Sequence, residues 1–452
     1  MSAETNIFRR AVGGLATSWN EFVHRGDPLA IAPQPDLPPR DLARVRDAML
    51  ACVRDGGGDV TRRARAAGLG RAYLTLDATG KRRFFELLAE FDLERDFVRD
   101  ALERTHDARD GDDFETAAHD LRDALVPPWL ALLRQFNELP NGTKFLVDLR
   151  ADLLEVEGLS PTLRRLERDL KHLLASWFDI GFLELRRITW DASATLLEKL
   201  ARYEAVHEVR SWLDLKDRLD SDRRCFAYLH PAMPNEPLIF VEVALVGEIS
   251  DKIAPLLDPK APQGDPGQAS VAIFYSISNC QKGLAGISFG NALIKRVVEA
   301  LSSEFRNVRT FSTLSPIPGF RRWLDSPDSG SLALSDDLRA VMAKRGWQRD
   351  AALVGQTRGP LLRACAHYLL EAKGGDGGAR DPVARFHLSN GARLERLNWQ
   401  GDLSAKGLRD SAGLMVNYLY RSDEIDPNHE AYVTRGQIAT SKNVRELLKP
   451  PR

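Results

Sequence analysis

The stretch VAIFYSISNCQKGLAGISFGNALIKRVVEAL, residues Val271–Leu301, indicates the fold of the second half of the chain. Its first seven residues, ending at Ile277, are rich in β-branched and aromatic side chains, which is typical of a buried strand. A polar, glycine-rich loop follows at Gln281–Gly286. From about Ala285 the apolar positions recur every four residues, which predicts an amphipathic helix. A strand, a glycine loop and a helix in this order can offer backbone N–H groups to a phosphate.

The loop itself has two interpretations. An ordinary turn between a strand and a helix also needs glycines, and the spacing matches neither the dinucleotide fingerprint nor a Walker A loop. It is closest to Q-x-x-G-x-G, the pyrophosphate loop of the GNAT acyl-CoA-binding fold. Gln281 and Gly286 match that pattern, while Leu284 replaces its first glycine. Lys282 adds a positive charge that would suit a phosphate ligand.

The surrounding sequence predicts two regions of different secondary structure. From about Pro39 to Trp177 the apolar spacing is helical, and glycine and proline separate the helices, which favours a bundle. The glycine-rich segment Gly56–Gly70 has no preceding strand, so we expect a loop there and not a nucleotide site. From about Ile180 short apolar runs alternate with helical stretches, which indicates an α/β domain.

Two segments place a serine and a histidine where chemistry could use them. In FSTLSPIPGF (Phe311–Phe320) an apolar, β-prone run stops at Ser315, because the two following prolines do not fit a helix or a central strand. In FHLSNGA (Phe386–Ala392) His387 precedes an Asn-Gly pair, which signals a turn or the end of a helix. Taken singly, a turn serine and a packed or exposed histidine are the simpler interpretations.

Composition excludes several classes of function. The 452 residues suggest two or three domains, and a net charge of −1 does not favour nucleic acid or an anionic membrane as partner. The longest apolar stretch, 237–247, is too short to span a bilayer, and the N-terminus lacks the apolar region of a signal peptide. The four cysteines have neither zinc-site nor disulfide-framework spacing. We therefore expect a cytoplasmic protein without a bound metal.

Several segments, taken in order, resemble the malonyl-CoA decarboxylase family, and we expect a bacterial member. They include HPAMPNEPLIFVEVAL (His230–Leu245), FYSISNCQKGL, FSTLSPIPGF, FHLSNGARLERLNW and GLMVNYLY. The resemblance is dense over about Trp177–Tyr432. It implies an α plus α/β fold, with a helical bundle over residues 1–178 and a GNAT-like mixed α/β catalytic domain over residues 179–452.

The resemblance also implies which residues act. The family's catalytic serine and histidine fall on Ser315 and His387. Ser288 stands where the family's animal members carry a glutamate, and Asn417 and Tyr420 are further polar candidates for substrate binding; a tyrosine-rich strand is the alternative for these two. For coenzyme A we expect contacts from the strand and the loop, through Phe274, Ser276, Ile277, Ser278, Gln281, Lys282, Gly283, Leu284 and Gly286.

Malonyl-CoA, the substrate that the resemblance implies, needs no cofactor because its own thioester accepts the electrons released with CO2. The enzyme has to stabilise the enolate and deliver a proton to carbon. His387 suits the proton delivery, and Ser315 suits a hydrogen bond to the substrate or, as the alternative, nucleophilic attack. An acyl-CoA N-acyltransferase and a non-catalytic malonyl-CoA-binding protein are the other functions to test. We also expect a homo-oligomer formed through the helical domain.

Overall fold

The computed structural model describes residue 19 and residues 32–53, 58–109, 111–287, 293–332, 335–375 and 377–449. The chain divides into two compact units. The first comprises residues up to Phe182 together with Pro231–Met233 and Gln281–Ile287, and the second comprises the remaining residues. The glycine-rich loop therefore packs with the helical unit, although the strand before it belongs to the other unit.

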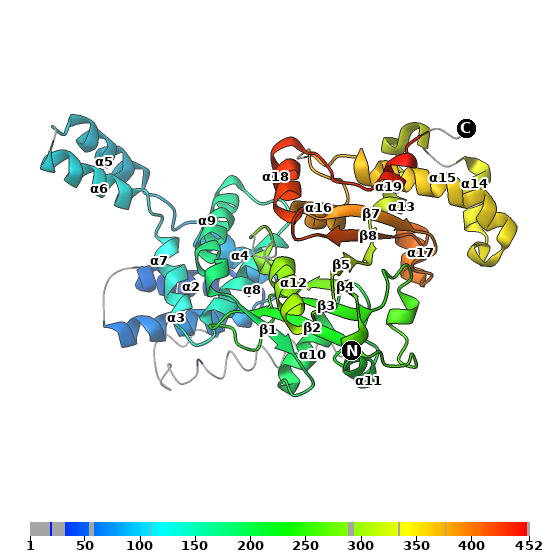
Figure 1. Cartoon of the computed structure of the whole chain (residues 1–452). Helices are drawn as coiled ribbons and strands as arrows, with labels where there is room; N and C mark the ends of the chain where they lie inside the picture. The colour runs from blue at the N-terminus through cyan, green and yellow to red at the C-terminus, as the bar shows by residue number, and fades with distance from the viewer. Residues whose placement is uncertain are drawn as a thin grey trace. The chain divides into compact units, whose positions relative to one another are not determined.

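The first unit is helical, as the apolar spacing predicts. Helix α9 begins at Pro161, and the side chain of the preceding Ser160 caps it by accepting a hydrogen bond from the N–H of Leu163. The helices α5 and α6 pair as a hairpin that extends away from the other helices of this unit (Figure 1). The elements of the unit are α2 (Pro39–Val53), α3 (Asp59–Leu74), α4 (Ala78–Leu88), α5 (Arg95–Asp107), α6 (Asp112–Ala124), α7 (Trp129–Asn137), α8 (Gly142–Leu154), α9 (Pro161–Trp177), η1 (Ile180–Phe182) and η4 (Lys282–Leu284).

Aromatic side chains form the centre of this unit. The Tyr73 ring meets the rings of Phe84 and Phe145 edge-on, at centroid distances of 4.9 and 5.6 Å. Edge-on contacts of this kind stabilise a core beyond the apolar area that they bury. The loop expected at Gly56–Gly70 is wrong from Asp59 onward, because these residues begin α3. A Cβ on Gly70 would lie only 2.3 Å from the Trp19 ring, so the glycine allows the helix to pack closely.

The second unit is built on a mixed sheet. Among the described residues its strands form one eight-stranded sheet in the order β1-β2-β3-β4-β5-β8-β6, with β7 on the other edge of β8. The apolar runs near residues 224–230, 237–245, 271–278 and 308–314 are strands, as predicted. The strands are β1 (Glu184–Ile188), β2 (Arg223–Leu229), β3 (Ile239–Val246), β4 (Val271–Asn279), β5 (Thr310–Thr313), β6 (Ser315–Pro316), β7 (Arg393–Asn398) and β8 (Met415–Tyr420).

Helices accompany this sheet (Figure 1). Ala285 and Gly286, where the helix was expected to begin, form a turn in which Gly286 has φ +73°. Residues 288–292 lie outside the described part of the chain, and the helix is described from Leu293. The fold-class prediction of a helical region followed by a mixed α/β domain is confirmed. The helical elements are α10 (Ala194–Tyr203), α11 (Trp212–Asp217), η2 (Ala254–Leu256), η3 (Pro266–Gln268), α12 (Leu293–Glu304), α13 (Phe320–Leu324), η6 (Pro327–Leu332), α14 (Asp336–Ala343), η7 (Trp347–Arg349), α15 (Ala351–Leu370), α16 (Pro382–Ser389), α17 (Ala405–Ser411), α18 (Ile425–Arg435) and α19 (Lys442–Glu446).

Two irregularities of the sheet leave backbone groups of β4 unpaired by a described strand and place Ser315 at a break between strands. Strand β4 pairs in parallel with β5 only over residues 271–274, so no described strand covers that edge of β4 from Tyr275 to Asn279. The strand before Ser315 ends at Thr313, and β6 resumes at Ser315 against a different part of β8. No described helix is long and apolar enough to cross a membrane.

Candidate active site

Ser315 lies directly after the interruption between β5 and β6. The neighbouring strand β8 supplies hydrogen bonds at this interruption. The Tyr418 N–H donates to the Thr313 hydroxyl at 3.1 Å, and the Asn417 amide donates to the Thr313 carbonyl at 2.6 Å. The Ser315 hydroxyl donates to the Thr313 hydroxyl at 2.9 Å. At the interruption, side-chain hydrogen bonds replace the regular backbone pairing of the strands. One of these bonds, from Ser315 to Thr313, fixes the orientation of the Ser315 side chain.

His387 lies in the last turn of α16, in agreement with the predicted helix end. Asp381 caps the start of this helix by accepting hydrogen bonds from the N–H groups of Val383 and Ala384, at 3.0 and 2.9 Å. The helix ends at Ser389 with Asn390 as its C-cap, and Gly391 follows with φ +78°. A Cβ on Gly391 would lie 2.0 Å from a backbone oxygen of α18, so only glycine fits this turn.

The structure brings Ser315 and His387 together from segments 72 residues apart. The Ser315 Oγ lies 3.0 Å from the His387 Nε2. The other ring nitrogen, Nδ1, lies 2.8 Å from the Tyr420 hydroxyl, and the Tyr418 ring stacks on the imidazole with a centroid distance of 4.6 Å. The imidazole is therefore held by hydrogen bonds at both nitrogens and by a stacked ring on one face.

The side chains of His387 and Tyr420 are both neutral in the free protein. Burial lowers the pKa of His387 to about 3, so its imidazole is uncharged at neutral pH in the free protein. Burial also raises the pKa of Tyr420 well above its ordinary value. The group that orients Nδ1 is a phenol and not the carboxylate of a Ser-His-Asp triad, so it cannot neutralise an imidazolium by charge. The arrangement suits proton transfer between neutral groups better than strong activation of a nucleophile.

Asp381 connects the two segments of the site. Besides capping α16, its Oδ2 accepts long hydrogen bonds of 3.4 Å from the Gly319 N–H, four residues after Ser315, and from the Tyr368 hydroxyl. Burial raises the pKa of Asp381 to about 6, while the backbone N–H groups oppose that shift. The carboxylate thus holds the start of the His387 helix against the turn that follows Ser315.

The other residues expected to bind substrate differ in their surroundings. Tyr420 lies in the cluster as the partner of His387. The Asn417 amide is fully bonded: it donates to the carbonyls of Thr313 and Ser250 and accepts from Asn398 and Arg396. A substrate contact would have to replace one of these four bonds. Ser288 lies outside the described residues.

Three of the candidate coenzyme A residues on β4 have side chains that are buried within the protein. Phe274 is buried, and the hydroxyls of Ser276 and Ser278 donate to the buried carboxylate of Glu204. The half-buried Ile277 lies between the two serines. Of the three buried residues, only the backbone is available to a ligand, along the edge of β4 that no described strand covers.

The loop after β4 is fixed to the helical unit. Gly283 lies so close to α8 that a Cβ would meet the Val147 carbonyl oxygen at 1.8 Å, and Gln281 and Leu284 are also buried. Lys282 points outward and pairs with the exposed Glu155 at 3.2 Å. Besides Lys282, the exposed part of the loop is its turn at 285–286.

Comparison with known proteins identifies the family. The malonyl-CoA decarboxylase C-terminal domain matches residues 181–452, and the N-terminal domain of the same family matches residues 91–178. The chain belongs to the malonyl-CoA decarboxylase family. The mitochondrial malonyl-CoA decarboxylase of Mus musculus is 36% identical over 97% of this chain and 93% of its own, and that of Rattus norvegicus is 39% identical over 73% and 72%. The crystal structure of malonyl-CoA decarboxylase from Rhodopseudomonas palustris is 43% identical, with a TM-score of 0.83 over 90% of this chain and 99% of that one.

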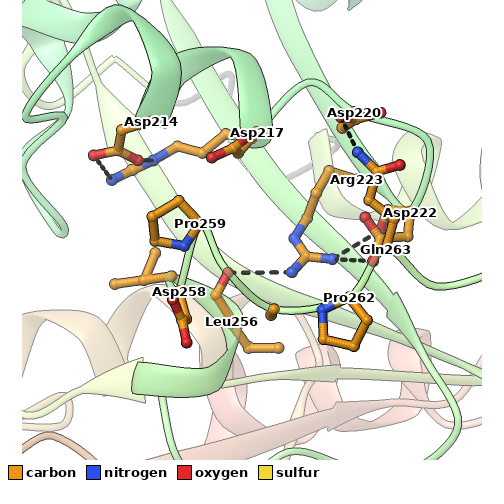
Figure 2. Close-up of a pocket in the computed structure, with 13 residues that line it drawn as sticks. Asp214, Asp217, Asp220, Asp222, Arg223, Leu256, Asp258, Pro259, Pro262 and Gln263 are labelled. Carbon is orange, nitrogen blue, oxygen red and sulfur yellow. Dashed lines mark hydrogen bonds and ion pairs between the residues drawn. The ribbon is translucent and has the colours of Figure 1, made fainter.

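A pocket elsewhere in the α/β unit of this malonyl-CoA decarboxylase family member contains neither Ser315 nor His387. Figure 2 shows both guanidinium groups paired with carboxylates, Arg223 with Asp222 and Arg218 with Asp214, each at 2.8 Å. No group of three or more metal-ligating side chains is found among the described residues. The charged residues around the pocket are Asp214, Asp217, Arg218, Asp220, Asp222, Arg223 and Asp258.

Sequence reasoning missed three residues that support the site and the loop. Asp381 could have been found, because an aspartate before a proline is a helix-start signal. Thr313 carries no signal of its own, since its role depends on the interruption between β5 and β6. Arg150 is 133 residues from the Gly283 carbonyl that it binds, so local sequence cannot reveal that contact.

Proposed function

We propose that this chain converts malonyl-CoA to acetyl-CoA and CO2. The observation that carries the proposal is the buried contact of 3.0 Å between Ser315 and His387 in a chain of this family. The test is to mix the purified protein with malonyl-CoA and to follow acetyl-CoA and CO2 together. Formation of N-acetylated products from acetyl-CoA and amines, without CO2 release from malonyl-CoA, would favour an acyltransferase, which the family match does not support. Binding without turnover would favour a non-catalytic malonyl-CoA-binding protein.

The reaction consumes one proton. Breaking the bond between the methylene carbon and the carboxylate releases CO2 and leaves an electron pair, which the thioester carbonyl holds as an enolate. The methylene carbon then takes up a proton to become the methyl group of acetyl-CoA. The protein therefore has to orient the carboxylate out of the plane of the thioester, stabilise the enolate oxygen and supply that proton.

His387 is suited to supply the proton once substrate is bound. In the free protein its pKa is about 3, which leaves the ring neutral. The malonyl carboxylate brings a negative charge, and a nearby negative charge raises the pKa of an imidazole. Substrate binding would thus recruit the proton that the reaction consumes, and Tyr420 would keep the ring oriented while Nε2 faces Ser315.

We assign Ser315 a hydrogen-bonding role toward the carboxylate or the enolate. The phenol at the far nitrogen of His387 stabilises an imidazolium less than a carboxylate does, which disfavours formation of a malonyl-serine. Rapid-quench mass spectrometry during turnover tests this assignment. A malonyl or acetyl adduct on Ser315 would replace it with covalent catalysis.

For coenzyme A we propose two contacts. The uncovered backbone edge of β4, residues 275–279, pairs with the pantetheine amides, and the turn at Gly286 approaches the pyrophosphate. Gly286→Val adds a Cβ at φ +73°, where side chains are strained, and blocks the close approach of backbone to phosphate. We expect it to raise KM for malonyl-CoA with little change in kcat. An unchanged KM would place the nucleotide elsewhere.

The proposed chemistry needs no metal or organic cofactor, because the thioester itself accepts the electron pair. Dialysis against a chelator, followed by assay in metal-free buffer, should leave kcat unchanged. A loss that a divalent metal restores would contradict this part of the proposal. Ser288, outside the described residues, remains a proposed substrate contact.

We further propose a cytoplasmic homo-oligomer assembled through the helical unit. The α5–α6 hairpin exposes Phe97, Leu102 and Phe114, each about half accessible to solvent. Light scattering on the wild type and on a variant with these three residues changed to serine tests the interface. The four described cysteines are free and buried, which suits a reducing compartment. Cell fractionation tests the location.

A further inference from the structure

Arg150 of α8 orients the turn that the proposed function assigns to the phosphate end of coenzyme A. Its guanidinium donates to the carbonyl of Gly283 at 2.6 Å and to that of Ala285 at 2.9 Å. Glu167 of α9 holds the same guanidinium at 2.7 Å, and Arg150 is only 2% exposed. Because these carbonyls are bound to Arg150, their negative ends are turned away from the exposed side of the turn.

One N–H group at the exposed side of the turn has no acceptor among the described residues. The N–H groups of Leu284, Ala285 and Ile287 donate to carbonyls within the loop. The Gly286 N–H donates to no acceptor among the described residues, and Gly286 itself is exposed. A donor of this kind next to carbonyls that are already bonded favours an anionic ligand.

A lysine of the helical unit lies over the same glycine. The Lys171 Nζ of α9 is 3.1 Å from the position that a Cβ on Gly286 would occupy. Lys171 is half-buried, and no carboxylate pairs with it among the described residues. Lys282, by contrast, points into solvent and already pairs with Glu155. Within the part of the chain that the structure describes, Lys171 is therefore a cation without a counter-ion, beside a backbone N–H without an acceptor.

We propose that Lys171 binds a phosphate group of coenzyme A together with the Gly286 N–H, so that the helical unit contributes directly to substrate recognition. The inference rests on the proposed function in that it takes an acyl-CoA as the ligand. The shared chemistry is a phosphate, which is either the pyrophosphate or the 3′-phosphate of the nucleotide. An ammonium suits both, because it acts as a compact charge with freely rotating donors.

The main test compares Lys171→Met with Lys171→Arg on two substrates. Malonyl-CoA carries the phosphates, and malonyl-pantetheine carries the same thioester without them. We expect Lys171→Met to raise KM for malonyl-CoA about tenfold to a hundredfold, the range for losing a charged hydrogen bond, with kcat unchanged. Lys171→Arg should recover most of the affinity. The kinetics of Lys171→Met on malonyl-pantetheine should equal those of the wild type.

A matched control removes one positive charge from the same helix. Arg164→Met acts at a site that is exposed and bound to the Leu159 carbonyl, and it should leave both substrates unaffected. Two results would overturn the inference. Unchanged KM for malonyl-CoA in Lys171→Met would mean that the lysine does not contact the ligand. An equal rise of KM for malonyl-pantetheine would mean that the lysine acts only through the structure.

Direct binding separates this inference from the proposed reaction. Titration calorimetry with coenzyme A, dephospho-coenzyme A and pantetheine needs no turnover. If the protein forms no acetyl-CoA but Lys171→Met still weakens coenzyme A binding, the proposed reaction fails and the inference stands. If the wild type binds coenzyme A no more tightly than pantetheine, the inference fails. If Lys171→Met also weakens the binding of dephospho-coenzyme A, the lysine contacts the pyrophosphate. If Lys171→Met leaves the affinity for dephospho-coenzyme A unchanged, the lysine contacts the 3′-phosphate.

Discussion

The α/β unit buries two polar clusters of opposite character. The His387 cluster, comprising Thr313, Ser315, His387 and Tyr420, consists of groups that are neutral at pH 7. The Arg218 cluster comprises Glu204, Asp214, Arg218 and Glu242. In it the Arg218 guanidinium binds Asp214 at 2.8 Å and Glu242 at 3.2 Å, and Ser276 and Ser278 donate to Glu204.

The difference shows that burial and perturbed ionisation do not by themselves mark an active site. In the Arg218 cluster Arg218 is already bound to Asp214 and Glu242, and Glu204 is already bound to Ser276 and Ser278 of β4. The cluster therefore stabilises β4. In the His387 cluster the Ser315 hydroxyl donates to Thr313, so the neutral imidazole donates to Ser315 through Nε2 and accepts from the Tyr420 hydroxyl at Nδ1. Only the neutral cluster can receive a charged substrate without first breaking an ion pair. Replacing single residues in each cluster should therefore separate chemistry from stability.

Replacing His387 with asparagine should have the largest effect. If the imidazole delivers the proton, kcat falls by about 10²–10⁴, the range for general acid–base catalysis, while KM stays within a few fold. Steady-state formation of acetyl-CoA measures both constants, and circular dichroism verifies folding. His119→Asn, on the exposed face of α6, is the matched control. A kcat within tenfold of the wild type in His387→Asn would remove the histidine from the chemistry.

Replacing Ser315 with alanine comes next. Loss of one donor to a developing oxyanion costs about 2.7–4 kcal/mol, which corresponds to a decrease in kcat of about 10²–10³. Because Ser315 and His387 act on the same developing charge, the double variant should be little slower than His387→Asn alone. Effects that multiply in the double variant would show that the two residues act in separate steps.

Replacing Glu242 with glutamine tests the charged cluster through stability. Burial raises the pKa of Glu242 from 4.5 to about 8, with Glu204 adding to the shift and Arg218 opposing it. Between these values the folded state holds a proton that the unfolded state releases, so stability falls as pH rises, by up to about 1.4 kcal/mol per pH unit. Denaturant unfolding across pH 5–8 should show a flatter profile for Glu242→Gln, with kcat unchanged. The same profile in both proteins would contradict the raised pKa.

The His387 cluster should have the opposite dependence on pH. Its histidine has a folded pKa of about 3 against 6.5 when unfolded, so between these values the unfolded state binds the extra proton and stability rises with pH. The same neutrality predicts that His387 contributes no acidic limb with an apparent pKa near 6.5 to kcat/KM, because the imidazole of the free enzyme does not titrate there. A limb near 6.5 that disappears in His387→Asn would show that the ring is more hydrated than this structure has it.

Sequence predicts those parts of the fold and site that depend on local pattern. The strands β2 to β5, the helix end after His387 and the Ser160 cap follow from periodicity and capping residues. The segment Gly56–Gly70 misleads because glycine there serves packing against Trp19, which is remote in sequence. Which group orients His387 is equally non-local, since Tyr420 reaches the imidazole only through the register of β8. The neutral ionisation state of the histidine depends on burial and could not be deduced from its ordinary pKa.

Replacing Tyr420 with phenylalanine should have the smallest effect and most directly tests the neutral cluster. The change removes the hydroxyl at Nδ1 and keeps the ring that packs near Phe274. A neutral hydrogen bond contributes about 0.5–1.5 kcal/mol, so we expect kcat to fall about twofold to twelvefold with KM unchanged. If Tyr420 is a positioning residue, the loss should disappear in the His387→Asn background, because no imidazole remains to orient. A loss that persists there, or a rise in KM alone, would instead assign Tyr420 to the substrate.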